Sequence, residues 1–308
     1  MKKKRTDEKN NLSIVILSYN VRELLVNCID SLLKDPDSIN WQIIIVDNNS
    51  QDDSVNFIKK NYPNILLIES KNNLGFSAGN NLAIDRIESK YVLFLNPDTL
   101  VRANAISTTL RYLSAHPQVG AATCKVELPN GIIDEGCHRG FPTPWNALCH
   151  FSGLSKIFNK SKWFSGYILG YKNYNEIHEI DALTGAFMMI PTSVGKQLDW
   201  WDEDYFWNGE DIDFCYRIKQ LGLKVMYLPD VKITHFKGSS GGYKKNSHGK
   251  ETVNKETKIL AAKSSTQAMK IFYEKHYKQR YPRWLTWISL RGIDLLEKVR
   301  VLPLQLSK

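Results

Sequence analysis

Short apolar runs alternate with amphipathic segments along the first 125 residues. The runs are almost continuously apolar, which predicts strands buried on both faces, at residues 12–18, 42–47, 65–69, 91–95 and 119–126. The segments between them show the helical period of 3.6 residues, at residues 21–34, 51–61, 76–88 and 103–115. This alternation predicts an α/β fold with a mostly parallel, Rossmann-like central sheet flanked by helices.

The pattern after residue 126 is less regular. Pro129, Asn130 and Gly131 predict the turn of a hairpin, and Pro191 is expected to open a short helix. Further elements are expected as strands at 182–190 and 223–228, and as helices at 211–221, 252–278 and 284–300. Residues 137–180 have no period and are interpreted as a lid or substrate loop, and residues 244–250 as a mobile polar loop.

Composition indicates a soluble globular protein in a reducing compartment. Of the 308 residues, 43% are hydrophobic and 24% are charged, which is typical of globular chains. The five cysteines are odd in number and form no CxxC pair, so we expect neither disulfides nor a structural zinc ion. A run of about 18 apolar residues would be needed to span a membrane, and the sequence contains none.

The net charge of +9 is concentrated near the C-terminus. Residues 250–308 contain 13 Lys or Arg and 5 Asp or Glu, whereas the rest of the chain is close to neutral. This argues against nucleic acid as a partner, because no basic face extends over the fold. We therefore expect a basic disordered N-terminus at 1–11, a core domain at 12–240 and a basic amphipathic helical tail at 250–308.

Polar residues follow three of the predicted strands. They are Ser18, Tyr19 and Asn20 after the first, Asp47 and Asn49 after the second, and Asn96 and Asp98 after the fourth. Ligands of an open parallel sheet lie beyond the carboxyl ends of its strands, so these residues are expected to form one site. Asp47 could accept a hydrogen bond from N3–H of uracil or thymine. The alternative is that Asp47 caps the helix at 51–61, although Ser50, Asp52 and Asp53 already serve that need.

Two further loops carry ligand-binding chemistry. Asn73, Gly75 and Asn80 lie in a strand-to-helix loop whose glycines permit close backbone approach, although the loop matches neither a Walker A motif nor GxGxxG. Asn96 and Asp98 could bind a divalent ion such as Mg²⁺ or Mn²⁺ through oxygen, or could form an Asx turn.

An acidic cluster at Glu210 and Asp211 begins a predicted helix. A carboxylate there could act as a general base in a site kept dry by Trp207, or the cluster could simply complement the helix N-terminus. His235, before a Gly/Ser loop, could contact a metal or a diphosphate, or could be structural.

Taken in order, these pieces resemble the inverting family 2 glycosyltransferases with a GT-A fold, in particular their rhamnosyltransferase-like branch. The matching segments are residues 16–20, 46–52, 73–81, 95–99, 183–187, 208–213 and 235–239. They extend over residues 12–240 and are specific as an ordered set. The resemblance implies a nucleotide-sugar-binding half at 12–125 and an acceptor and catalytic half at 126–240.

The resemblance also implies a role for each matching residue. The donor would be bound by Ser18, Tyr19, Asn20, Asp47, Asn49, Asn73, Gly75, Asn80 and Asn96. A Mg²⁺ or Mn²⁺ cofactor would be held by Asp98, with His235 contacting the metal or diphosphate. Asp211 would be the general base, with Glu210 as the alternate, and the acceptor pocket would include Thr184, Gly185 and Trp207. One departure is Asn96, which stands where members with a full Asp-X-Asp motif have a carboxylate. This implies either weaker metal binding or a metal held by one carboxylate and a water.

The implied reaction moves a sugar, with rhamnose as the expected one, from a dTDP- or UDP-sugar to a saccharide or lipid-linked saccharide in bacterial cell-surface polysaccharide synthesis. Two alternatives are a nucleotidyltransferase, which a Lys- or Arg-bearing phosphate loop after residues 12–18 would support, and a non-catalytic nucleotide-sugar or lipid-carrier binding protein. The sequence has no such loop after residues 12–18, so the nucleotidyltransferase alternative lacks support.

The tail suggests where such an enzyme would act. Its apolar residues Trp284, Trp287, Ile288, Leu295, Leu296 and Val299 lie among several arginines and lysines. Such segments favour anionic membrane surfaces, which predicts a cytoplasmic protein on the inner face of the cell membrane. The alternative is that this helix packs against the core.

Overall fold

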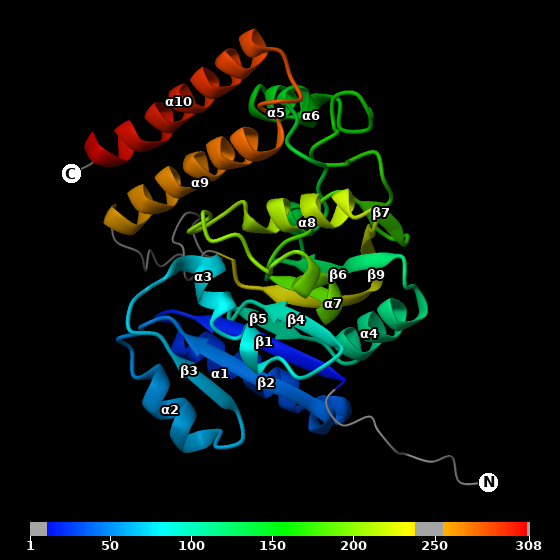
Figure 1. The fold of residues 1–308 in the computed structure, drawn as a ribbon, viewed down its shortest axis with the longest axis vertical. Helices are drawn as coiled ribbons and strands as arrows, with labels where there is room; N and C mark the ends of the chain where they lie inside the picture. Colours follow the sequence, from blue (N-terminus) through cyan, green and yellow to red (C-terminus); the bar gives the residue numbers. More distant parts are fainter. Residues whose placement is uncertain (1–10, 238–254, 307–308) are drawn as a thin grey trace.

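The computed structural model describes residues 11–237 and 255–306, and the expectations for the basic N-terminus before residue 11 and for the loop at 244–250 lie outside them. Its first half is a parallel sheet covered by helices (Figure 1). The strands are β1 (Leu12–Ser18), β2 (Trp41–Asp47), β3 (Leu66–Glu69) and β4 (Tyr91–Leu95), in the order β3-β2-β1-β4. The helices are α1 (Arg22–Leu33), α2 (Ser54–Asn61), α3 (Gly75–Asn81) and α4 (Ala105–Ala115), with 3₁₀ turns at Pro36–Asn40 and Ile84–Arg86.

Two helices of this half are shorter than the sequence predicts. Helix α2 begins at Ser54, because the Asp52 carboxylate binds the backbone N–H groups of Arg22 and Ser54 in a turn outside the helix. Helix α3 ends at Asn81. Beyond it, the N–H groups of Leu82 and Ala83 donate to the carbonyls three residues earlier, which is the 3₁₀ pattern, and the 3₁₀ turn follows.

The second half makes the sheet mixed. β8 (Phe187–Pro191) pairs antiparallel with β4 and with β6 (Val119–Glu127), which pairs parallel with β9 (Lys224–His235). β5 (Thr99–Val101) and β7 (His178–Ile180) pair antiparallel with β9. The α/β prediction is therefore confirmed, but the sheet beyond β4 is not parallel throughout.

Several local predictions in this half need correction. The strand predicted at 182–190 begins only at Phe187, because residues 182–186 form a loop toward the active-site edge. The strand predicted at 223–228 continues to His235 through an irregularity opposite Cys124 and Lys125. The hairpin around Gly131 is a single bridge between Glu127 and Ile133.

The region without a period contains elements of its own. They are a 3₁₀ turn at Glu135–Cys137, α5 (Pro144–Phe151), α6 (Leu154–Ile157) and β7. Pro191 does precede a short helix, α7 (Thr192–Gln197), and α8 (Glu210–Gln220) begins one residue before the predicted start.

The C-terminal extension is an antiparallel pair of helices, α9 (Lys255–His276) and α10 (Arg283–Leu306), at one end of the molecule (Figure 1). Helix α9 buries Phe272 and Tyr273 against the core, and Tyr277 in the turn after the helix is buried there as well. None of the helices within residues 11–237 and 255–306 is long and apolar enough to cross a membrane.

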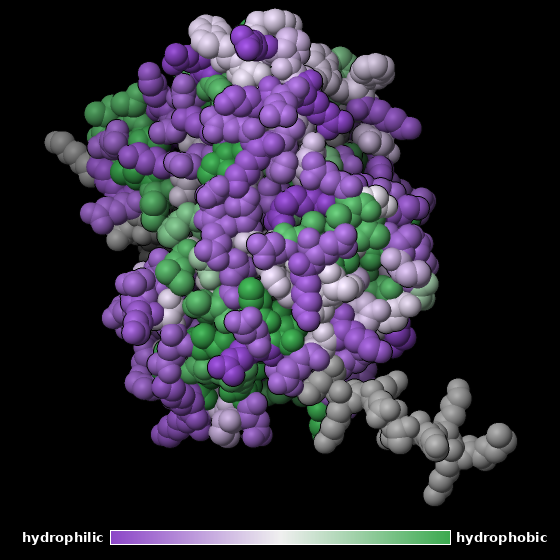
Figure 2. Space-filling view, in the orientation of Figure 1, coloured by the Kyte–Doolittle hydropathy of each residue, from purple (hydrophilic) through white to green (hydrophobic). Residues whose placement is uncertain are grey.

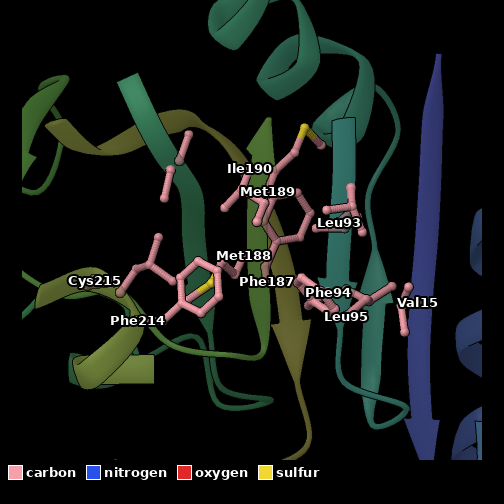
Figure 3. Packing of buried hydrophobic residues seen from close by; sticks show 14 of the residues in the cluster. Val15, Leu93, Phe94, Leu95, Phe187, Met188, Met189, Ile190, Phe214 and Cys215 are labelled. Carbon is pink, nitrogen blue, oxygen red and sulfur yellow. The ribbon is translucent and has the colours of Figure 1, made fainter. Parts of the chain in front are cut away.

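The main core lies between the central strands and α8. Phe94 and Phe187 from neighbouring strands and Phe214 from α8 are fully buried there (Figure 3). Removing such an aromatic side chain typically costs about 3–5 kcal/mol, so this core fixes α8 and the acidic residues at its start. All five cysteines are free and buried, as expected from their spacing.

Candidate active site

The carboxyl ends of β1 and β2 form a polar edge with two unpaired buried groups. Ser18 and Asp47 are register partners, and the N–H of Asn48 donates to the Ser18 carbonyl at 2.8 Å. Asp47 Oδ2 accepts from the N–H of Ser50 at 2.9 Å, whereas Asp47 Oδ1 and Ser18 Oγ, both buried, have no hydrogen-bond partner among residues 11–237 and 255–306. A buried polar atom without a partner is costly, so these two atoms point to a bound ligand.

Asn48 organises the next loop, and the sequence analysis gave it no role. Its Nδ2 donates to Asn73 Oδ1 at 2.9 Å and to the Gly75 carbonyl at 3.1 Å, and its Oδ1 accepts from Leu74 N–H at 2.9 Å. Asn73 Oδ1 also accepts from the N–H of Gly75 at 3.0 Å. Buried Asn48 therefore holds the loop that begins α3 against the end of β2.

Other predicted donor residues hold the loops together or pack inside them. Asn20 and Asn49 have left-handed backbone conformations with positive φ. Asn20 Oδ1 accepts a hydrogen bond from the N–H of Gln51 at 2.6 Å, and the neighbouring Tyr19 is exposed. Asn80 is buried and donates to the carbonyl of Phe76, within its own helix. Through these contacts Asn20 and Asn80 stabilise the backbone at the edge of the site.

Gly75 allows the backbone of another loop of the protein, rather than a ligand, to approach closely. Its φ is +78°, and a Cβ there would lie 2.3 Å from the carbonyl oxygen of Phe206. That carbonyl accepts from the N–H of Phe76 at 2.7 Å. The glycine thus lets the 199–209 loop, which carries half-buried Trp207, dock on the start of α3.

A second cluster forms where β5 pairs with β9. Thr99 is the register partner of His235, which places His235 Nε2 3.1 Å from Asp98 Oδ1 and 3.5 Å from Asn96 Nδ2. On the other side of the ring, Nδ1 lies 3.4 Å from Asp134 Oδ2. Burial alone would lower the pKa of His235, but the carboxylates of Asp98 and Asp134 raise it to about 9. The sequence analysis gave Asp134 no role.

Asp134 is itself held by Lys237, whose Nζ lies 2.7 Å from Asp134 Oδ1. Burial works to raise the pKa of Asp134, yet the hydrogen bond from His235 and the charge of Lys237 hold it well below its usual range. Asp134 is therefore a charged carboxylate that orients the imidazole from behind.

The third cluster lies at the start of α8. Arg139 Nη2 donates to Asp211 Oδ2 at 2.7 Å and to the carbonyl of Leu183 at 2.7 Å, and the N–H of Gly185 also donates to Asp211 Oδ2 at 3.3 Å. The sequence analysis gave Arg139 no role, since it falls in the stretch without a period. Gly185 itself is tightly packed, because a Cβ there would lie 3.0 Å from the ring of Phe76.

Thr184 lies beside this cluster but is used locally. Its Oγ1 accepts from the N–H of Ala186 at 3.3 Å, which closes the turn before β8. The structure thus brings Thr184 and Gly185 to the carboxylates at the start of α8.

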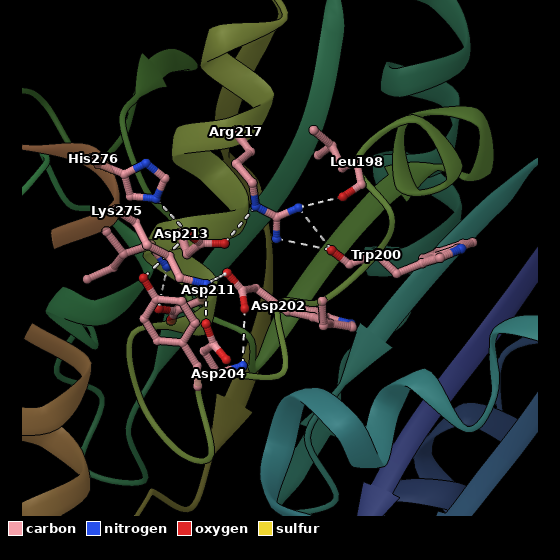
Figure 4. A network of polar contacts seen from close by, with 12 residues as sticks. Leu198, Trp200, Asp202, Asp204, Asp211, Asp213, Arg217, Lys275 and His276 are labelled. Atoms are coloured by element: carbon pink, nitrogen blue, oxygen red, sulfur yellow. Dashed lines mark hydrogen bonds and ion pairs between the residues drawn. The ribbon is translucent and has the colours of Figure 1, made fainter. Parts of the chain in front are cut away.

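The carboxylates at the start of α8 have different surroundings. Burial and neighbouring Asp211 raise the pKa of Glu210 to about 8, and its Oε2 has no hydrogen-bond partner in the described part of the chain. Asp213 instead binds Arg217 Nε at 2.7 Å and His276 Nε2 at 2.7 Å, tying α8 to α9 (Figure 4). The carboxylates of Glu210, Asp211 and Asp213 therefore differ in their partners: Glu210 Oε2 has none in the described residues, Asp211 pairs with Arg139, and Asp213 links α8 to α9.

Comparison with known proteins identifies the family. The profile described as "Glycosyl transferase family 2" matches residues 13–168, about half of the chain. The chain belongs to this family. It is 24% identical to "Rhamnosyltransferase WbbL" of Escherichia coli (strain K12) over 234 residues, covering 72% of this chain and 82% of the relative. It is also 24% identical to "N-acetylglucosaminyl-diphospho-decaprenol L-rhamnosyltransferase" of Mycobacterium tuberculosis (strain CDC 1551 / Oshkosh), covering 67% of this chain and 70% of the relative.

Solved structures support the GT-A fold of this family 2 glycosyltransferase. The mannosyltransferase PcManGT of Pyrobaculum calidifontis, solved with GDP-Man and Mn²⁺, aligns with a TM-score of 0.54 at 15% identity, covering 95% of this chain and 87% of that one. GalNAc-T7, solved with UDP, GalNAc and Mn²⁺, aligns with a TM-score of 0.56 at 18% identity, covering 73% of this chain and 43% of that one. The family leaves the nucleotidyltransferase alternative without support.

Asp98 and His235 are the residues that could contribute to a divalent-ion site. The described residues contain no group of three or more His, Cys, Asp or Glu that could hold one, so the protein supplies few ligands. Asp98 and His235 nevertheless present an oxygen and a nitrogen 3.1 Å apart, and Asp134 supports the ring from behind as a carboxylate does in many metal sites. Such a mixed set suits Mn²⁺, with the other positions left to donor phosphates and water.

Proposed function

We propose that this protein is an inverting glycosyltransferase that moves a sugar from a uridine or thymidine diphosphate sugar to a hydroxyl group of a saccharide or lipid-linked saccharide. The observation that carries the proposal is that Ser18 Oγ and Asp47 Oδ1, buried where β1 and β2 end, have no hydrogen-bond partner in the described residues. The carboxylate–imidazole pair of Asp98 and His235 and the two buried carboxylates at the start of α8 support it. The names of the relatives support rhamnose as the sugar and a cell-surface glycan as the product.

The donor half supplies recognition. Asp47 Oδ1 is a buried acceptor without a partner in residues 11–237 and 255–306, which suits N3–H of uracil or thymine. Beside it, Ser18 Oγ can bind the same nucleoside. Both bases carry this N3–H, so we propose UDP- and dTDP-sugars alike as donor candidates.

The diphosphate would be bound near Asp98 and His235. A divalent ion bound there would supply positive charge to balance that of the leaving diphosphate. Asp98 and His235 would hold that ion, and Asp134 keeps the imidazole of His235 oriented.

The carboxylates at the start of α8 supply the base. We assign proton abstraction from the acceptor hydroxyl to Asp211, because Arg139 at 2.7 Å compensates its negative charge and fixes its position. Glu210 remains the alternate, and its raised pKa of about 8 keeps it protonated at neutral pH. Attack of the alkoxide opposite the leaving diphosphate inverts the anomeric carbon in a single displacement.

The first test is nucleoside diphosphate release from a panel of UDP- and dTDP-sugars, with Mn²⁺ or Mg²⁺ and with or without a bacterial lipid extract. We expect release from one donor, stimulated by the extract and lost in Asp98→Ala. Release from none of the donors by the intact protein, despite nucleotide binding, would favour the non-catalytic binding protein instead.

Two variants separate donor binding from chemistry. Asp211→Asn should lose transfer but keep donor affinity, whereas Asp47→Asn should weaken UDP and dTDP binding in calorimetry. Asp85→Asn, at an exposed position in the 3₁₀ turn after α3, is the matched control. Transfer by Asp211→Asn at the rate of the unmodified protein would refute the assignment of the base.

We also place the enzyme at the cytoplasmic face of the membrane, where a lipid-linked acceptor would be presented. Support comes from the basic tail and from the printed name of the mycobacterial relative, which includes a decaprenol-linked saccharide. Fractionation of cells that express the protein tests this placement.

A further inference from the structure

Helix α10 turns one apolar stripe away from the protein. The stripe comprises Trp284, Trp287, Ile288, Leu295, Val299, Leu302 and Leu306, all of them exposed. Except for the adjacent Trp287 and Ile288, successive members are three, four or seven residues apart, which places them along one side of the helix. Atoms of apolar residues gather where the C-terminal half of α10 lies (Figure 2). A continuous apolar stripe of this size usually marks an interaction site.

The charges of α10 are divided between its two sides. The acidic residues Asp294 and Glu297 face α9, where Lys270 Nζ lies 2.8 Å from Asp294 and 3.6 Å from Glu297. Arg291 Nη1 also lies 3.6 Å from Asp294 Oδ2. Arg283, Arg291 and Lys298 are exposed beside the apolar stripe. The outer side of α10 is therefore apolar and basic, and its acidic groups are neutralised on the inner side.

A second segment also combines exposed apolar side chains with positive charge. Residues 144–163, which include α5 and α6, expose the apolar side chains of Trp145, Leu148, Phe151, Ile157, Phe158 and Trp163. Trp163 is 79% exposed and Ile157 74% exposed, which is unusual for such large apolar side chains. Between Glu135 and Glu176 the sequence contains no acidic residue, and Lys156, Lys160 and Lys162 lie within the segment.

The two elements meet. The guanidinium of Arg300 lies 5.7 Å from the centre of the Phe151 ring, so the end of α5 touches α10. Trp145 Nε1 donates to the carbonyl of Trp163 at 2.7 Å, which fixes the loop after α6 against α5. Both elements lie at the end of the molecule formed by α9 and α10 (Figure 1).

We propose that the outer side of α10, together with the exposed apolar side chains of residues 144–163 that adjoin α10 at Arg300, docks on membranes that contain anionic lipids. Large apolar side chains would enter the headgroup region, with lysines and arginines at the lipid phosphates. The charges favour this occupant over a second copy of the chain, because two such basic faces would repel each other. The proposal rests on the proposed function only in giving the lipid-linked acceptor a reason to be near, and vesicle binding requires no turnover.

The proposal also extends beyond the tail. Residues 144–163, which lie within the stretch without a sequence period, would contact the membrane together with α10. Arg139, which pairs with Asp211, lies shortly before α5 in the sequence, so the segment that would dock is linked along the chain to the proposed base.

The test is co-sedimentation of the intact protein with vesicles of phosphatidylcholine alone or with one quarter phosphatidylglycerol, without donor or acceptor. Three variants remove one feature each: Trp284→Ser with Trp287→Ser, Arg283→Gln with Arg291→Gln, and Ile157→Ser with Trp163→Ser. The matched control is Ile39→Ser with Ile132→Ser, which changes exposed apolar residues elsewhere. Circular dichroism confirms that each variant is folded.

We expect binding to the anionic vesicles, weakened at least roughly tenfold by either apolar pair and unchanged in the control. The arginine pair should weaken binding about 25-fold, since each basic residue near an anionic surface contributes about fivefold. Equal binding by all variants, or no binding by the intact protein, would overturn the proposal. So would a change from dimer to monomer in the apolar variants, because the face would then join two copies. Loss of vesicle binding with donor turnover retained would leave the proposed function standing.

Discussion

Replacing Arg139 with methionine is expected to lower the free energy of unfolding by about 3 kcal/mol or more at pH 7. The Arg139 and Asp211 side chains are 15% and 12% exposed, and their nearest nitrogen and oxygen are 2.7 Å apart. Methionine keeps much of the apolar stem but removes the charge. Loss of one partner of a buried ion pair typically costs about 3–5 kcal/mol, because the other charge is left uncompensated.

The magnitude follows from the distance. At 2.7 Å and an effective dielectric constant of about 20, the attraction between two unit charges is about 6 kcal/mol. Two groups remain near Asp211 after the change, the N–H of Gly185 on Oδ2 and the N–H of Ile212 on Oδ1. They stabilise part of the charge, so the expected loss lies near the lower end of the range for buried pairs.

The assay is urea unfolding of Arg139→Met, Asp211→Asn and the double variant. In the double variant the stranded carboxylate is gone, so we expect it to recover at least about 1 kcal/mol over Arg139→Met. Arg111→Met, an exposed position on α4, is the control and should change stability by less than about 0.5 kcal/mol. A loss below about 1 kcal/mol in Arg139→Met, or no recovery in the double variant, would refute the reasoning.

Three further changes test other parts of the site. Asp134→Asn should weaken Mn²⁺ binding by about 10–100-fold in calorimetry, because the imidazole loses its supporting carboxylate; unchanged affinity would place the metal elsewhere. Gly75→Ala should destabilise the fold by more than about 1 kcal/mol, since φ is +78° and the new Cβ would meet the Phe206 carbonyl, whereas Gly131→Ala, at φ +79° in open space, should cost less. Equal costs would show that the close contact is unimportant. Burial raises the pKa of Glu210 from 4.5 to about 8, so the folded chain holds this proton more tightly and stability should fall as pH rises between those values. Glu210→Gln should flatten that part of the stability profile, and an unchanged slope would contradict the raised pKa.

The donor half of the fold could be predicted because its strands are buried on both faces. Such strands form short apolar runs, and their parallel pairing brings the residues after each run to one edge. Ser18 and Asp47 are therefore neighbours in the structure, as their positions after the runs predict. The strand boundaries there differ from the prediction by one residue at most.

The same reasoning fails at residues 182–190. Ala182, Leu183 and Ala186 are buried, which makes the run look like a strand from its first residue. They are buried because the loop packs around the carboxylate of Asp211, to which the N–H of Gly185 donates. Hydrophobicity reports burial alone, so it cannot distinguish a buried loop from a buried strand.

The roles of the acidic residues on α8 show why the rest of the site required the structure. The sequence places Glu210, Asp211 and Asp213 in the first turn of a helix, where all three would be favourable. Their difference comes from partners that are distant in the chain. Arg139 pairs with Asp211, and His276 together with Arg217 pairs with Asp213, while Glu210 has no cation within ion-pair distance in the described residues. One of these partners comes from a stretch without a period and another from the C-terminal extension, so no local pattern could assign the base. Partners from distant parts of the chain therefore distinguish these carboxylates. The double variant of Arg139 and Asp211 measures one of these pairings directly.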